Sequence, residues 1–213
     1  MTESAFQRYL DLEPTTERPA VVLVAGIPGS GKSTLAEALA RHLRGPIVSM
    51  DWVLGTVTQF PELSDETAGS LVDLNLFAST ARHVQLGIDV VVDATAHTRE
   101  SRDQWRELTE RLGGVFVGVE CVCSDEGLHR ERVKGRDRGI PGWYPTVPWE
   151  HVQRMRGLWE PWENEHLVLD SAVETPDSSL RRVLDVFQGL RSPGETADPG
   201  IQSSQGVSHT SVR

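Results

Sequence analysis

The stretch Gly26-Ile27-Pro28-Gly29-Ser30-Gly31-Lys32-Ser33 decides the fold of this chain. It fits the pattern G-x-x-x-x-G-K-[ST] at every fixed position. Residues 20–25 before it form a short apolar run, and residues 32–44 after it carry leucines at helical spacing. A strand, a glycine-rich turn and a helix therefore follow one another, which is the setting in which such a loop binds phosphate groups.

The glycines of this phosphate loop let its backbone curl with the amides pointing inward, and the helix start adds positive potential. We expect Lys32 to reach the β- and γ-phosphates of a nucleoside triphosphate and the Ser33 hydroxyl to bind Mg²⁺. The sequence therefore predicts ATP and Mg²⁺ as cofactors. The residues expected to hold the nucleotide are Gly26, Pro28, Gly29, Ser30, Gly31, Lys32, Ser33 and Thr34.

Strand-like and helix-like segments alternate over the rest of the chain. The pattern predicts strands at 20–25, 47–50, 88–92, 115–122 and 167–169, and helices at 32–44, 65–86, 98–112, 124–138, 148–160 and 178–190. The strand segments are continuously apolar rather than alternating, which indicates a parallel sheet covered on both faces. We expect an α/β fold: one three-layer domain with a five-stranded parallel sheet in a kinase-type strand order.

This domain is expected to span residues 20–191, with a lid at about 137–148. Residues 1–19 are predicted to form an N-terminal arm with a short amphipathic motif. Residues 192–213 have almost no large apolar side chains, so burial cannot offset their ordering entropy, and we expect a disordered tail.

Composition narrows the classes of partner. The formal net charge of −10 counts against a long duplex nucleic acid as ligand, although a local cluster could still hold a small anion. The apolar stretches are too short to span a bilayer, so no membrane partner is expected. The two cysteines and the lack of a secretory signal favour a reducing, cytoplasmic location. The sequence leaves the oligomeric state open.

Two aspartates follow predicted strands, where open parallel sheets bind their ligands. Asp51 comes after the second strand and is our candidate for the general base that takes the proton of an acceptor hydroxyl. Asp93 ends the third strand and is our candidate for a magnesium ligand together with Ser33. The alternatives are a helix cap for Asp51 and a turn residue for Asp93. Thr95 and His97 follow on the same loop and are candidate substrate contacts.

Positive and aromatic side chains near the lid could complete the site. Arg132 and Arg136 are four residues apart, would share one helix face, and could stabilise charge on the transferred phosphoryl group. The alternative is a solvated helix with internal ion pairs. In the lid, Trp143 and Tyr144 could stack on a base or another flat substrate, or could pack the loop against the domain.

These motifs resemble the small P-loop kinases that include the polynucleotide 5′-hydroxyl kinases, chloramphenicol phosphotransferase and the zeta toxins, a group of the AAA family ATPase type. The resemblance rests on segments 26–34, 49–51, 91–95 and 147–161 and on Arg132 with Arg136. It implies Asp51 as general base, Lys32 and Arg136 on the phosphates, and a lid over the nucleotide. Met50 and Ala96-His97 depart from the pattern, and both departures lie on the acceptor side.

The sequence thus predicts an ATP-dependent kinase that phosphorylates a hydroxyl, with a nucleoside, a nucleotide or a nucleic-acid 5′ end as the favoured acceptor. An antibiotic or small metabolite is the alternative acceptor, and a toxin acting on a sugar nucleotide is a third hypothesis. A P-loop ATPase that acts as a switch on a protein partner is an alternative of another class. A GTPase is disfavoured because the chain lacks the Asn/Thr-Lys-x-Asp motif.

Overall fold

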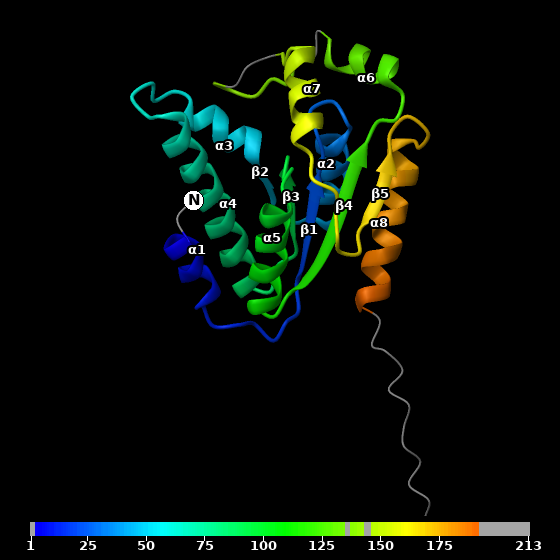
Figure 1. Cartoon of the computed structure of the whole chain (residues 1–213). Coiled ribbons are helices and arrows are strands. Elements are labelled where there is room, and N and C mark those ends of the chain that lie inside the picture. Colours follow the sequence, from blue (N-terminus) through cyan, green and yellow to red (C-terminus); the bar gives the residue numbers. More distant parts are fainter. Residues whose placement is uncertain (1–2, 135–136, 143–145, 192–213) are drawn as a thin grey trace, which may run out of the picture.

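The computed structural model describes residues 3–134, 137–142 and 146–191. Five parallel strands form one sheet in the order β2-β3-β1-β4-β5 (Figure 1). Their bounds are Ala20–Ala25 for β1, Ile47–Ser49 for β2, Val90–Ala94 for β3, Val115–Val122 for β4 and Leu167–Asp170 for β5. The predicted α/β fold with a five-stranded parallel sheet is confirmed.

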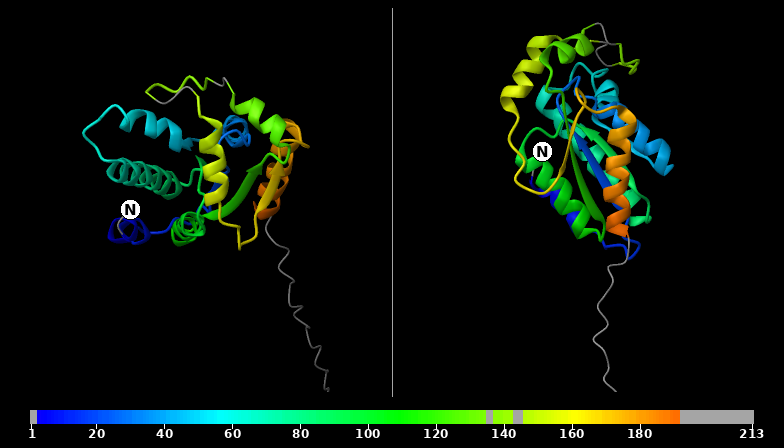
Figure 2. Two further views of the ribbon diagram at one scale, coloured as in Figure 1. Left: turned by 45° about the horizontal axis from the view of Figure 1, so that its top comes forward. Right: turned by 90° about the vertical axis from the view of Figure 1, so that its right-hand side faces the viewer.

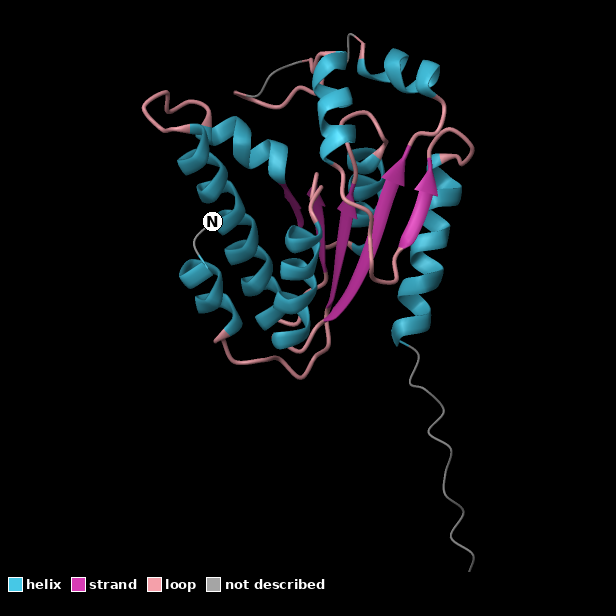
Figure 3. Cartoon of the chain, in the orientation of Figure 1, coloured by secondary structure: helices cyan, strands magenta, loops and turns pink. Residues whose placement is uncertain are grey.

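Helices cover both faces of the sheet (Figures 2 and 3). The apolar side chains of α1, α4 and α5 pack on one face, and those of α2 and α8 pack on the other. The helices are α1 Glu3–Leu10, α2 Lys32–Leu43, α3 Met50–Val57, α4 Asp65–Gln85, α5 Arg99–Arg111, α6 Glu126–Val133, α7 Trp149–Leu158 and α8 Pro176–Arg191. Since α3, α6 and α7 stand beyond the upper ends of the strands, they surround the edge where the site lies (Figure 1).

The central strand β1 explains the unbroken apolar run in the sequence. Successive side chains of a strand point to opposite faces, and both faces of this sheet are covered. Val21 and Leu23 pack toward α4 and α5, whereas Val22 and Val24 pack toward α2 and α8. All four side chains are fully buried. The loop that follows β1 therefore begins from a fully buried strand at the centre of the sheet.

Two sequence predictions about helices were wrong. The helix expected over 124–138 ends at Val133, and Lys134, its C-cap, has an extended backbone. Gly135, Asp137 and Gly139 follow in the sequence, and residues of these types are poor helix formers. The helix α3 was not predicted, because its short apolar stretch directly follows β2 without a turn signal. No helix within the described ranges is long and apolar enough to cross a bilayer.

A buried arginine ties together two segments near the site. Arg102 of α5 is 3% exposed and donates hydrogen bonds to the carbonyl oxygens of Ala96 (2.9 Å), Glu160 (2.7 Å) and Pro161 (3.1 Å). Its guanidinium also lies over the rings of Trp159 and Trp162. The loop after β3 and the segment after α7 are thus held by a single cation.

We expect Arg102→Met to lower the free energy of unfolding by about 2–4 kcal/mol, because it leaves several buried carbonyl oxygens without a donor. Urea unfolding followed by circular dichroism measures this. Arg111→Met is the matched control on the same helix, since Arg111 is exposed, and it should cost less than about 0.5 kcal/mol. If both variants lost the same free energy of unfolding, Arg102 would not be the residue that holds these two segments together.

Candidate active site

The phosphate loop lies between β1 and α2, and its glycines Gly26 and Gly29 leave no room for a side chain. Gly29 has a φ of 86°, and a Cβ there would lie 2.5 Å from Val133 Cγ2 and 2.9 Å from the ring of His129. Gly31 has a φ of 98°. The hydroxyl of Ser30 is buried and has no hydrogen-bond partner in the described part of the chain. A cradle of this shape with an unsatisfied polar group fits a bound phosphate chain.

Lys32 and Asp93 are buried side by side next to this loop. Lys32 Nζ lies 4.0 Å from Asp93 Oδ1, and the Ser49 hydroxyl donates to Asp93 Oδ2 at 3.2 Å. Asp93 is 3% exposed within β3, so its interpretation as a turn residue is wrong. Its Oδ1 has no hydrogen-bond partner among the described residues. The Ser33 hydroxyl and this carboxylate are the hard oxygen donors that Mg²⁺ prefers.

Asp51 is held by an arginine that the sequence analysis did not select. Arg138 Nη1 forms an ion pair with Asp51 Oδ2, and Arg138 Nη2 donates to the Ser33 hydroxyl at 3.0 Å. Burial lowers the pKa of the Arg138 guanidinium. Asp51 lies in the first turn of α3 with Ser49 as N-cap, so the interpretation of Asp51 as the cap is also wrong. In the sequence, Arg138 differs from the neighbouring arginines only in standing directly before Gly139, in the segment predicted as a lid.

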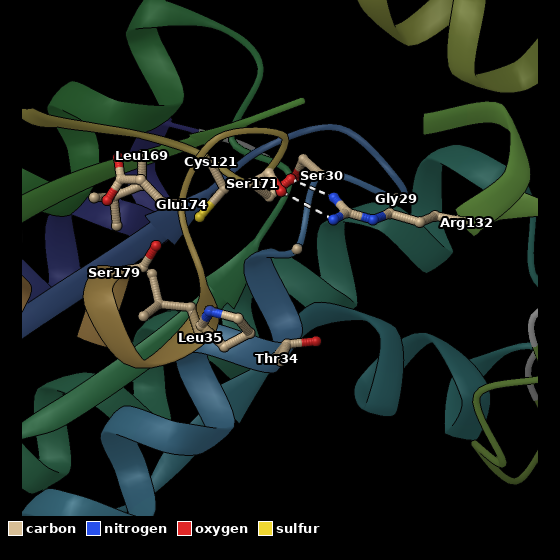
Figure 4. Close-up of a pocket in the computed structure, with 12 residues that line it drawn as sticks. Gly29, Ser30, Thr34, Leu35, Cys121, Arg132, Leu169, Ser171, Glu174 and Ser179 are labelled. Atoms are coloured by element: carbon tan, nitrogen blue, oxygen red, sulfur yellow. Dashed lines mark hydrogen bonds between the residues drawn. The ribbon is translucent and has the colours of Figure 1, made fainter. Parts of the chain in front are cut away.

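Arg132 lies at a different part of the loop. Its two terminal nitrogens donate to the hydroxyl and the carbonyl oxygen of Ser171, at 2.6 and 2.9 Å (Figure 4). It lines a cavity of about 350 Å³ that we call the nucleotide cavity. The other residues around this cavity are Gly29, Ser30, Gly31, Thr34, Leu35, Cys121, Leu169, Ser171, Glu174, Pro176 and Ser179. Arg136 lies outside the described residues, and α6, which carries Arg132, ends at Val133.

A second cavity, of about 420 Å³, is lined by most of the remaining candidate site residues, and we call it the acceptor cavity. Lys32, Asp51, Thr95, His97 and Arg138 all line it. The rest of its wall consists of Pro28, Gly29, Met50, Leu54, Asp73, Ala96, Thr98, Ser101, Val133, Val147, His151 and Met155. Trp143 and Tyr144 lie outside the described residues. Among the described residues, Gly29 is the only one that lines both cavities, so the phosphate loop stands between them.

His129 is a further residue that the sequence analysis missed. Its side chain in α6 is fully buried, and its Nε2 lies 2.8 Å from the carbonyl oxygen of Pro28 in the phosphate loop. Nε2 must therefore donate, which leaves Nδ1 to accept from Arg156 Nη2 at 3.3 Å. Burial lowers the pKa of His129, which favours this neutral form. The helix α6 is thus tied to the loop by an uncharged imidazole.

Comparison with known proteins agrees with this geometry. A family model described as an AAA domain matches residues 21–161, from β1 through α7. The chain belongs to this AAA domain family. A probable adenylyl-sulfate kinase of Aeropyrum pernix is 29% identical over 183 residues, which cover 82% of this chain and 95% of that protein.

Two solved structures share the fold of this AAA domain protein. A putative kinase from Chloroflexus aurantiacus has a TM-score of 0.61 at 19% identity, over 82% of this chain and 99% of the other. Kti12 of Chaetomium thermophilum, in complex with ADP-AlF3, has a TM-score of 0.62 at 17% identity, over 80% of this chain and 98% of the other. Family, fold and relatives together identify a P-loop kinase, an ATP-dependent phosphotransferase with an alcohol group as acceptor.

The buried His129 makes stability depend on pH in a defined direction. Its pKa is lower in the folded than in the unfolded state, so below about pH 6.5 the unfolded chain takes up the proton first and stability falls. Relative to His129→Gln, the wild type should lose up to about 1.4 kcal/mol more per pH unit between about pH 7 and 5.5. Urea unfolding across this range measures the difference. His42→Gln, at an exposed position, should keep the wild-type slope, and a wild-type slope in His129→Gln would contradict the assignment.

Proposed function

We propose that this P-loop kinase transfers the γ-phosphoryl group of ATP to a hydroxyl of a small molecule bound in the acceptor cavity. The observation that carries the proposal is the shared wall of that cavity, where Lys32, Asp51 and Arg138 meet beside the phosphate loop. A carboxylate and two cations around one position are what phosphoryl transfer to a hydroxyl needs.

The nucleotide occupies the loop and the nucleotide cavity in this proposal. Its phosphates lie over Gly29 to Lys32, and its base extends past Arg132 toward Ser171, away from the acceptor. Ser33 and Asp93 would hold Mg²⁺, which when bound neutralises charge on the β- and γ-phosphate oxygens. No group of three or more His, Cys, Asp or Glu side chains among the described residues could hold a metal ion. The phosphates would therefore supply part of its ligand set.

Asp51 acts as the general base. It takes the proton of the acceptor hydroxyl as that oxygen bonds to the γ-phosphorus, while the bond from phosphorus to the β–γ bridging oxygen breaks and ADP leaves. Lys32 and Arg138 stabilise the charge on the transferred group. Asp51 must first lose its ion pair with Arg138, and a phosphate chain can draw the guanidinium away because it offers several anionic oxygens.

A nucleoside or nucleic-acid 5′-hydroxyl is the second candidate acceptor. The motifs at 49–51 and 91–95 favour it through their resemblance to polynucleotide kinases. The net charge of −10 favours a small molecule, because a nucleic-acid strand would meet an overall repulsive protein. Hydroxylated antibiotics and metabolites are small molecules of the proposed kind.

Asp51→Asn should lower transfer by about 10²–10⁴-fold and leave ATP binding nearly unchanged, because it removes only the general base. The measurement is ADP release with Mg²⁺ and a panel of 5′-hydroxyl oligonucleotides, nucleosides, antibiotics and polyols. Asp185→Asn on the exposed surface of α8 is the matched control and should behave as wild type. Release indifferent to every acceptor and to Asp51→Asn would instead support an ATPase switch that acts on a protein partner.

Substitutions of Arg138 and Arg132 should affect different steady-state constants. We expect Arg138→Met to lower kcat by about 10²–10³-fold and to raise the KM for ATP only a few-fold, because Arg138 contacts the phosphates of bound ATP but contributes most in the transition state. Arg132→Met should raise the KM for ATP and leave kcat within a few-fold, because Arg132 lines only the nucleotide cavity. The reverse pattern would contradict the assignment of the two cavities.

A further inference from the structure

The charges around the acceptor cavity are unevenly distributed. Among the described residues that line it, the charged side chains are Lys32, Asp51, Asp73 and Arg138. Both cations lie on the phosphate side, since Lys32 belongs to the loop and Arg138 bonds to Ser33. When ATP is bound, Lys32 and Arg138 both interact with its phosphates in the proposed mechanism. The acceptor is then left with two carboxylates and, within the described part of the wall, no further lysine or arginine.

Asp73 is the carboxylate that the phosphoryl-transfer reaction does not use. It lies on α4 next to the core residue Val72 and lines the acceptor cavity. Its carboxylate makes no hydrogen bond or ion pair within the described residues. The side chain is exposed. Burial of its surroundings raises the pKa of its carboxyl, and the positive charge of the chain's N-terminus partly offsets this shift. A carboxylate that lines a ligand cavity and makes no hydrogen bond or ion pair with the described residues suits a cationic group.

His151, one of the two histidines in the wall, does not supply that charge. His151 Nδ1 lies 2.8 Å from Arg154 Nη2, so this nitrogen accepts a hydrogen bond and carries no proton. Burial and the positive charge of Arg154 also lower the pKa of His151. His97 stands on the loop after β3, and its carbonyl oxygen accepts from the Glu160 amide at 2.9 Å. The rest of the wall is apolar, as at Leu54, or bears hydroxyls, as at Thr98.

We propose that the acceptor is an alcohol that also carries a positively charged amine. Asp73 binds the amine, and Asp51 receives the proton of the hydroxyl that is phosphorylated. The hydrocarbon part of the molecule lies against Met50, Leu54 and Met155, and its other polar groups meet the hydroxyls of the cavity wall. This proposal rests on the proposed function and names the substrate class of the same site.

An anionic acceptor fits this cavity poorly. Adenylyl sulfate, the acceptor in the name of the Aeropyrum pernix relative, carries a phosphate and a sulfate. Such groups would face Asp73 and Asp51, while the two cations of the cavity are engaged by ATP. The same repulsion acts on a nucleoside monophosphate and on the backbone of a nucleic-acid strand.

Acceptors of similar size that differ in charge test whether the cavity prefers a positively charged acceptor. Glucosamine, N-acetylglucosamine and gluconate have similar size and hydroxyl content but carry a positive, a neutral and a negative group. An aminated and an N-acetylated hydroxyl antibiotic extend the series, and adenylyl sulfate and a 5′-hydroxyl oligonucleotide complete it. Phosphoryl transfer from ATP is measured for the wild type, Asp73→Asn and Glu66→Gln. Glu66 is an exposed acid in the first turn of α4 that does not line the cavity, so Glu66→Gln is the charge-matched control.

The wild type should use the amines with kcat/KM at least about tenfold above their acetylated and acidic counterparts. Asp73→Asn should raise the KM for the amines about tenfold, with kcat and the KM for ATP nearly unchanged, because it removes an ion pair and leaves the chemistry in place. The acetylated compounds should not respond to Asp73→Asn. Glu66→Gln should match the wild type throughout.

Preference for neutral or anionic acceptors, or amine kinetics indifferent to Asp73→Asn, would overturn the amine proposal. If that transfer still depended on Asp51, the proposed kinase function would stand. Transfer to none of the compounds would overturn the amine proposal as well, and ADP release indifferent to Asp51→Asn would then overturn the kinase function too. A circular dichroism melt of Asp73→Asn separates loss of binding from loss of fold.

Discussion

The ion pair between Arg138 and Asp51 is the interaction on which the rest of the site depends. It joins the start of the lid to α3, and through Ser33 it also joins both to the phosphate loop. Removing two charges from water costs several kcal/mol, so such a pair persists only with good geometry and further hydrogen bonds. A triphosphate competes for the same guanidinium with more anionic oxygens. The base would thus be free only when ATP is present.

Three contacts between distant segments keep this pair in position. His129 holds α6 against Pro28, and Gly29 leaves no space between them. Arg102 holds the loop after β3 to the segment after α7. The segment predicted as a lid also contacts the end of α3, where the Thr58 hydroxyl donates to the carbonyl oxygen of Gly142 at 2.8 Å. Each of these contacts joins a loop or segment of the site to a helix. Since these helices pack on the sheet or lie over it, the packing of the core determines where the side chains of the site lie.

Local patterns in the sequence were sufficient to predict those strands and helix ends that depend on backbone hydrogen bonds or on burial in the core. The bounds of β1 and β4 were predicted correctly because both stretches are mostly apolar and rich in β-branched valine. Ser64 and Thr98 cap α4 and α5, and the side chain of each accepts from the amide three residues later. The helix α3 was missed because it follows β2 without a break, and α6 was predicted too long because its charged residues continue beyond its end.

The sequence by itself determined the phosphate loop, the parallel sheet and the positions of Asp51 and Asp93 beyond or at strand ends. These depend on residues close in the chain, and on the rule that parallel strands end at one edge. Only the tertiary structure decided which side chains meet there. Arg138 is 87 residues from Asp51, and His129 is 101 residues from Pro28. Asp73 reaches the acceptor cavity only because α4 packs beside α3. No local pattern encodes such pairings, since each depends on how helices far apart in sequence pack around a common sheet.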